Sequence, residues 1–572
     1  MALAVLSPAA TAAAAPPFSK SPPRLTKERA VAIFLEDDKV SDWLARYPRQ
    51  GRLTDAAYES DSSKCAGAAK GGCWTVHVWW KKNDRVDAGE IAQGKVDDRT
   101  RVVTEAWTGP QVAWKMARGY EGAFGGKKIN SVPVWLAFCI VFLLGLADFR
   151  RPLSLRNLDL LALLSFSVSL WYFNHGDIFT SVPLAYLPLV YLLGRCVWIG
   201  WRGRPVRAAP PLWPAWILLA ATVFLVGFRI GLNLEDSNVI DVGYAGVIGA
   251  QRIATGVVPY DNFPDENDLK ACGPADSEGE IRDRIQPNGR CESANPLGDT
   301  YGPVAYAAYL PGYWIRGWSG KWDDLPAVHL TSILFDVLCL LGLGLVGLRF
   351  GGPWLAAALA FAWAAYPFTQ YVSMSNTNDS IVPVFLIWGF WLVSSAWARG
   401  VAVALSGWTK FATLVVAPLW LAYPRGLPRP RPALAFAAGF LVATAISFSV
   451  LLLDAHPINA AWDFYHRTLK AQITRESPFS LWDWAQYHAR GIPDLHVVQW
   501  ILEGLLVVTA VVVAFVPRTK TPLQLAALTG ALLIGFELVL THWFYLYIPW
   551  FFPFVAFALL ATNGRAEREP AF

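Results

Sequence analysis

Two places between apolar segments have side chains suited to chemistry. One is Asp241, and the other is the stretch Gly298-Asp-Thr-Tyr-Gly-Pro-Val-Ala-Tyr at residues 298–306. Apolar residues recur at helical spacing from Val239 to Thr255, which predicts a helix with Asp241 in its first turn. A carboxylate at a membrane boundary is partly desolvated, which suits it to act as a general base. The alternative is a structural role, because an acid in a first turn also complements the helix dipole.

The predicted helix has one apolar face, so we expect it to lie on the outer leaflet of a membrane with that face buried. Asp236 or Ser237 could cap its first turn. Three further acids could act as the base in place of Asp241, namely Glu235, Asp236 and Asp299.

Basic and amide side chains near the ends of apolar segments predict a phosphate-binding site. Lys410 interrupts residues 401–423, which form either one broken span or two half-length helices. Its ammonium could bind a phosphate as a point charge or extend to the membrane interface. Arg475 suits bidentate phosphate recognition, although a solvated helix face is an equal alternative. Three polar residues open an apolar segment, where they are costly unless they bind something or cap a helix: Asn376, Asn378 and Asp379.

Aromatic side chains predict a platform for sugar rings or a lipid chain. Tyr301 and Tyr306 follow Asp299 in the turn-rich stretch, and His542 either lines the same cleft or belongs to an interfacial aromatic belt. Acids at 265–268 permit a divalent cation without arguing for one, and the spacings of the cysteines in polar segments are not typical of a zinc site. We therefore predict neither a metal site nor a cofactor.

The composition is typical of a polytopic α-helical membrane protein. Hydrophobic residues make up 54% of the 572 residues and charged residues only 16%. The net charge of +5 is too small to predict a nucleic-acid partner, so membrane lipids are the expected surroundings. Apolar segments of spanning length predict about 11 to 13 transmembrane helices. They begin at Val132, Leu158, Val182, Leu212, Ala327, Pro353, Ile381, Ala433, Leu495, Leu523 and Phe544.

Arginine-rich connections alternate with connections that have almost no Lys or Arg, and the positive-inside rule assigns the basic ones to the cytoplasm. They contain Arg150, Arg151, Arg156, Arg195, Arg202, Arg204, Arg207, Arg399, Arg425, Arg429, Arg431, Arg518 and Lys520. This topology places the N-terminal domain and the loop 233–326 outside the cell and the tail 563–572 inside. The expected location is the plasma or inner membrane, with an extracytoplasmic active face.

The chain divides into a signal-like leader at 1–23, a small domain at 24–130, three additional transmembrane helices at 131–211 and a core at 212–562. Two cysteine pairs in polar segments fit disulfides on an oxidising face, with free thiols as the alternative: Cys65 with Cys73, and Cys272 with Cys291. Three other cysteines lie in apolar runs and are expected to be buried, namely Cys139, Cys196 and Cys339.

The domain at 24–130 is expected to be α+β. A helix beginning near Leu25, with Thr26 or Ser21 as its cap, precedes strands at 74–80 and 102–107. A strand, turn and strand built on Gly94-Lys-Val-Asp-Asp-Arg-Thr-Arg-Val-Val end the domain. This order resembles a PepSY-type domain.

The core resembles another family. Asp241, followed by Gly249-Ala-Gln-Arg-Ile-Ala-Thr-Gly-Val-Val-Pro-Tyr, residues 298–306, and Ser375-Asn-Thr-Asn-Asp-Ser, looks like the polyprenyl-phosphate-dependent GT-C glycosyltransferases. The similarity is to their bacterial mannosyl- and arabinosyltransferase-like branch and covers roughly residues 212–560. The additional helices and the PepSY-like domain lie outside it.

The resemblance implies an inverting transfer of a mannose- or arabinose-like sugar from a polyprenyl-phosphate donor to an extracytoplasmic glycan, lipid or protein acceptor. It gives Asp241 a role similar to the acid that deprotonates the acceptor hydroxyl. Two other classes remain open. A transporter or flippase of a lipid-linked substrate would need polar residues at mid-span, and a non-enzymatic scaffold or sensor would depend on the PepSY-like domain.

Overall fold

The computed structural model describes residues 22–60, 65, 72–80, 89–118, 122–203, 212–260, 301–320, 324–426, 429–473 and 477–561. The chain forms two compact units, with the boundary after Val112. Most of the leader, the tail and four predicted site residues lie outside the described residues: Arg475, Asp299, Cys272 and Cys291.

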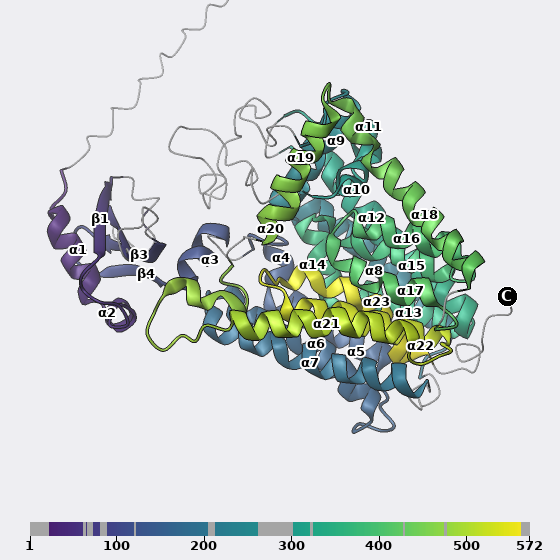
Figure 1. Ribbon diagram of the computed structural model, residues 1–572. Coiled ribbons are helices and arrows are strands. Elements are labelled where there is room, and N and C mark those ends of the chain that lie inside the picture. Colours follow the sequence, from purple (N-terminus) through teal and green to yellow (C-terminus); the bar gives the residue numbers. More distant parts are fainter. Residues whose placement is uncertain are drawn as a thin grey trace, which may run out of the picture. The chain divides into compact units, whose positions relative to one another are not determined.

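The N-terminal unit is a four-stranded antiparallel sheet with two helices, and its strands follow the chain order β1-β2-β3-β4 (Figure 1). The elements are α1 Lys27–Glu36, α2 Asp38–Leu44, β1 Arg52–Glu59, β2 Cys73–Trp80, β3 Gly89–Asp97 and β4 Val103–Thr108. Thr26 caps α1 as predicted, since its side chain accepts a hydrogen bond from the Arg29 N–H.

The α1 helix packs on one face of this sheet. Phe34 is fully buried, and its ring occupies the space that a Cβ at Gly94 would fill. Asp98 joins the β3–β4 turn to the start of the helical segment, because its carboxylate accepts the Arg24 and Leu25 N–H groups at 2.8 and 2.9 Å. The β3–β4 hairpin is the predicted strand, turn and strand.

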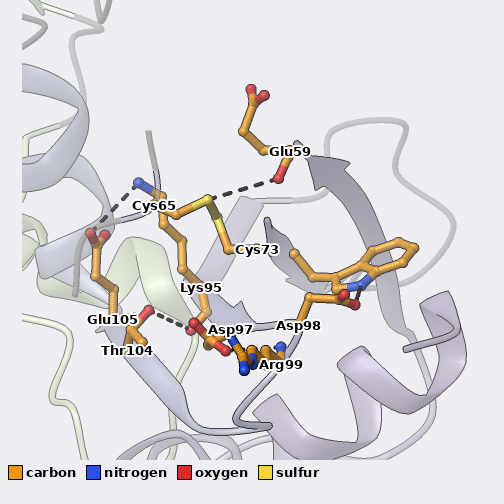
Figure 2. The surroundings of a disulfide bond; sticks show 10 residues. Glu59, Cys65, Cys73, Lys95, Asp97, Asp98, Arg99, Thr104 and Glu105 are labelled. Carbon is orange, nitrogen blue, oxygen red and sulfur yellow. Dashed lines mark hydrogen bonds and ion pairs between the residues drawn. A yellow bond between two sulfur atoms is a disulfide. The ribbon is translucent and has the colours of Figure 1, made fainter. Parts of the chain in front are cut away.

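The disulfide between Cys65 and Cys73 is present, so this pairing is confirmed (Figure 2). Figure 2 also shows Lys95 on β3 directed toward Glu105 on β4, with Nζ and Oε1 3.6 Å apart. Cys139, Cys196 and Cys339 are free thiols. Cys196 and Cys339 are buried as expected, whereas Cys139 is only partly buried.

The second unit is a bundle of helices, and six helices in its described part are long and apolar enough to cross a membrane. They are α7 Ile178–Arg202, α8 Ala215–Asp236, α12 Pro326–Gly351, α18 Pro430–Phe448 with its continuation to Leu453, α21 His496–Phe515 and α22 Pro522–Val539. Figure 1 shows α16 (Ala396–Gly407) beside α18, and α7 beside α22. The structure is therefore consistent with a polytopic helical protein with a small N-terminal sheet, but the described residues contain six helices of spanning length where 11 to 13 were predicted.

Other predicted segments are also helical but are not among these six, and all but α6 have 15 residues or fewer. They are α5 Val132–Leu146, α6 Leu155–Asn174, α13 Pro353–Ala365, α14 Pro367–Ser375, α15 Ile381–Trp391 and α23 Ile548–Leu560. The break between α13 and α14 falls at Tyr366, directly before Pro367, because a residue before proline is driven out of the helical region.

Residues 396–422 form a helical hairpin with Lys410 at its turn. The α16 helix ends at Gly407, and the return arm consists of η5 Phe411–Val416 and α17 Ala417–Ala422. Arg399, near the start of α16, donates to the Trp420 and Tyr423 carbonyls at 3.0 and 2.9 Å. The two outer ends of the hairpin therefore meet, which settles the choice between one span and two half-length helices.

Five arginines that the sequence analysis placed on connections lie inside helices, namely Arg156, Arg195, Arg202, Arg399 and Arg431. Arg195 and Arg399 lie away from the helix ends or are fully buried, and their partners are clear. Arg195 on α7 pairs with Asp159 on α6, with Nε 2.7 Å from Oδ1. Arg399 is buried and bonded to carbonyl groups of its own hairpin. Arg195 and Arg399 therefore have structural partners, which could not be predicted from the apolar residues beside them in the sequence.

Candidate functional site

The α9 helix, Asp241–Ala254, begins at Asp241 as predicted. Its position differs from the expectation, because Val242 to Ala250 are all buried and the helix does not lie on a surface. Three glycines at a spacing of three residues permit this close packing. A Cβ at these positions would overlap the Asn376 carbonyl (Gly243), the Tyr309 ring (Gly246) and the Tyr306 ring (Gly249).

Neither predicted cap is used by α9, whose N-cap is Ile240 without a side-chain bond. The Asp236 carboxylate accepts instead from the Lys128 N–H at 2.6 Å, and Glu235 pairs with the Lys128 Nζ at 3.5 Å. These two acids therefore serve the segment at the start of α4, Lys127–Asn130. Asp241 is half-buried, and its carboxylate has no hydrogen bond or ion pair among the described residues.

Lys410 is held at the hairpin turn by an acid and three aromatic rings. Its Nζ lies 2.6 Å from Asp379 Oδ1, and only 12% of the lysine side chain is exposed. The same ammonium lies 5.6, 5.1 and 5.2 Å from the ring centroids of Tyr301, Tyr547 and Trp550. Cations at such distances are attracted by the ring quadrupole. Lys410 is therefore enclosed and does not extend to an interface.

Asp379 is itself fixed. Its Oδ1 accepts from Trp550 Nε1 at 3.0 Å and its Oδ2 from Thr377 Oγ1 at 2.7 Å. The Thr377 hydroxyl oxygen also accepts the Asp379 N–H, which closes the turn of η4, Asn378–Ser380. Within the described residues, the buried Asn378 Oδ1 and Ser380 Oγ have no partner. The turn therefore presents one paired carboxylate and two unpaired polar atoms.

The stretch after residue 300 lies against the hairpin turn. Gly302 has no room for a side chain beside the Trp408 carbonyl, which also accepts from the Val304 N–H at 3.3 Å. The hydroxyl of Tyr306, which lies in α10 (Pro303–Ala307), accepts the Tyr301 N–H at 3.0 Å. Tyr306 is fully buried and supports Tyr301, so it is not an exposed platform as predicted.

Tyr260 joins the end of the α9 segment to this stretch. Its hydroxyl donates to the Tyr301 carbonyl at 3.0 Å. Burial raises the pKa of Tyr260 well above its usual value, so the phenol remains protonated and keeps this bond. The two motifs that the sequence analysis singled out are therefore adjacent at Tyr301.

Two predicted ligands occupy other positions. Asn376 is fully buried in the left-handed conformation that ends α14, and its amide bonds to Ser237 and Asn238, so it belongs to the packing beneath α9. His542 lies 2.9 Å from Ser477 Oγ through its Nδ1 and packs against Phe479 and Phe544. It is not among the groups around Lys410.

The sequence analysis missed the residues that complete the lysine site. Tyr547 and Trp550 stack at 4.2 Å between ring centroids, and both lie at the start of the last apolar segment. Their spacing of three residues places them on one helix face, and this signal could have identified them.

Among the described residues there is no group of three or more His, Cys, Asp and Glu side chains that could hold a metal ion. The acids at 265–268, which permitted a divalent cation, lie outside those residues.

Comparison with known proteins gives no further assignment. No protein-family model, no curated protein and no solved structure matches the chain.

Proposed function

We propose that the chain is a membrane glycosyltransferase of the GT-C type, which transfers a sugar from a polyprenyl phosphate to a hydroxyl group of an extracytoplasmic acceptor. The main support is the Lys410 ammonium, buried beneath aromatic rings at the turn of a helical hairpin. The motif containing Asp241 and the motif containing Tyr301 both contact this region.

Lys410 is suited to bind the donor phosphate. An ammonium has three N–H donors, and one of them is directed to Asp379. Two donors therefore remain for phosphate oxygens. The surrounding rings keep water away, and a charge pair is stronger where the local dielectric constant is low. Tyr301, Tyr547 and Trp550 also offer apolar faces to a sugar ring or to the first part of a prenyl chain.

Asp241 is the proposed base. The acceptor oxygen attacks the anomeric carbon of the donor, its proton passes to the Asp241 carboxylate, and the bond from the anomeric carbon to the phosphate oxygen breaks with inversion. The polyprenyl phosphate leaves with one more negative charge, which Lys410 stabilises. Asp241 suits this role because, unlike Asp236 and Glu235, it has no partner among the described residues.

Asp241→Asn tests the proposal. Loss of a positioned general base should lower turnover about 100- to 10,000-fold, while the protein elutes and melts like the wild type. Glu235→Gln is the matched control. Glu235 is an exposed acid that pairs with Lys128 and not with the groups around Lys410, so its loss should leave turnover unchanged. The assay follows transfer from polyprenyl-phosphate mannose and polyprenyl-phosphate arabinose in detergent. Near-normal turnover in Asp241→Asn would overturn the assignment.

A transporter is less well supported. The buried pair of Arg229 on α8 and Asp336 on α12 lies within the spans, but it has complete structural partners. Arg229 also donates to the Trp363 and Ala364 carbonyls, at 3.4 and 3.2 Å, and to the Thr369 hydroxyl at 3.2 Å. These bonds satisfy groups at the α13–α14 break, so the pair stabilises the helix break.

The scaffold alternative is tested by deleting residues 24–112. The deletion should stop there because the residues that follow belong to the second unit, as the 2.9 Å bond from Asn174 Nδ2 to Asn130 Oδ1 illustrates. An enzyme keeps its transfer activity without the N-terminal unit, whereas a scaffold or sensor loses its function.

A further inference from the structure

A buried polar network lies directly beneath the start of α9. Asn376 Nδ2 donates to Ser237 Oγ at 2.8 Å and to the Asn238 carbonyl at 3.0 Å. Its Oδ1 accepts from Asn233 Nδ2 at 3.0 Å. His329 Nδ1 lies 3.2 Å from both Asn233 Oδ1 and Ser237 Oγ. The network therefore joins α8, α12 and α14 to the four residues that connect α8 to α9.

This connection is also held through its backbone. The Asn238 N–H donates to the Met374 carbonyl at 3.0 Å, and the Ile240 N–H donates to the Ser375 carbonyl at 3.4 Å. The Asn376 carbonyl lies where a side chain at Gly243 would be. The residues before and after Asp241 are thus both fixed by the last turn of α14 and by Asn376.

We propose that Asn376 is a positioning residue that sets the place of the Asp241 carboxylate. The inference rests on the proposed function, in which Asp241 is the base. It replaces the expectation that Asn376 binds the donor phosphate. An asparagine amide has two N–H donors, and both are used by Ser237 and Asn238, so none remains for a phosphate oxygen.

Asparagine suits this position for a second reason. Asn376 has φ 50 and ψ 45, a left-handed conformation that favours glycine and asparagine. Glycine at this position would keep the backbone and remove only the amide. Asn376→Gly therefore tests the hydrogen bonds of the side chain without changing the backbone conformation.

The experiment compares Asn376→Gly with Ser375→Ala in the full chain. Ser375 is an adjacent buried residue whose hydroxyl, among the described residues, bonds only within its own helix, to the Tyr371 carbonyl at 2.8 Å, so its loss leaves the connection intact. A base displaced by about 1 Å can lower kcat about 100-fold, and we expect this fall in Asn376→Gly with an unchanged KM for polyprenyl-phosphate donor. Ser375→Ala should retain the wild-type kcat. A rise in KM at constant kcat would instead make Asn376 a donor ligand and overturn the proposal.

Amide hydrogen exchange gives a second measurement that does not depend on activity. Exchange at Asn238 and Ile240 should become faster in Asn376→Gly and remain slow in Ser375→Ala. Faster exchange in a protein without transferase activity would refute the proposed function alone, while leaving Asn376 as the residue that orders this connection. Unchanged exchange together with unchanged kcat would refute the positioning role alone.

Discussion

Lys410 and Asp379 can be tested for two different roles, as a structural ion pair and as a phosphate site. Lys410→Met leaves the Asp379 carboxylate, whose side chain is only 1% exposed, with two uncharged donors. Removing one partner of a buried pair costs about 3 to 5 kcal/mol of unfolding free energy. Asp379→Asn should cost less, about 1.5 to 3 kcal/mol, because the amide oxygen can still accept from Trp550 and the ammonium still faces three rings.

The double variant Lys410→Met/Asp379→Asn distinguishes the two roles. The double variant removes both charges. Its loss of unfolding free energy should therefore be about 0.5 to 3 kcal/mol smaller than the sum of the losses in the two single variants. Sugar transfer should not recover in the same protein, because the cation that stabilises the leaving phosphate is absent. Stability and activity are therefore expected to separate.

Unfolding free energies would be measured by titration with sodium dodecyl sulfate in mixed micelles, and transfer with the polyprenyl-phosphate donor. Additive single costs would show that the pair does not interact as the geometry indicates. Recovery of transfer in the double variant would show that Lys410 has only a structural role.

Two further predictions concern packing and the disulfide. Gly249→Ala should destabilise the protein by about 1 to 3 kcal/mol, because the new methyl group overlaps the Tyr306 ring, whereas Gly231→Ala, with open space around it, should stabilise it by about 0.5 to 1 kcal/mol. Thermal unfolding of both variants checks the signs, and equal effects would refute the packing argument. Replacing Cys65 and Cys73 by serine opens a loop with a sequence separation of 8, which should cost about 2.5 kcal/mol by the chain-entropy relation. Unfolding of the wild type should then shift with reductant while that of the double serine variant does not.

Much of the helical framework follows from local sequence. Apolar length predicted where helices start, and Asp241 lies at the start of a helix as predicted. Lys410 lies at a hairpin turn, which was one of the two alternatives that the sequence left open. The strand β1 was missed because its exposed residues show no alternation, with only Ala56 buried. An edge strand of this kind gives no periodic signal.

The partners of the site residues could not be predicted in the same way. Asp379 and Lys410 were both expected to bind phosphate, yet they bind each other across 31 residues of sequence. Such a pairing depends on how helices pack, which local patterns do not encode. The burial of α9 had a readable signal, since Gly243, Gly246 and Gly249 recur every three residues and allow other elements to approach closely.

Arg229 has a consequence for how the chain enters the membrane. An arginine at the centre of an isolated helix costs about 2.5 to 3.5 kcal/mol on insertion, so α8 on its own is a poor candidate for stable insertion. Its neutralising partner Asp336 is made 107 residues later, within α12. Stable residence of α8 in the bilayer is therefore expected only after α12 has been synthesised and the two helices have paired.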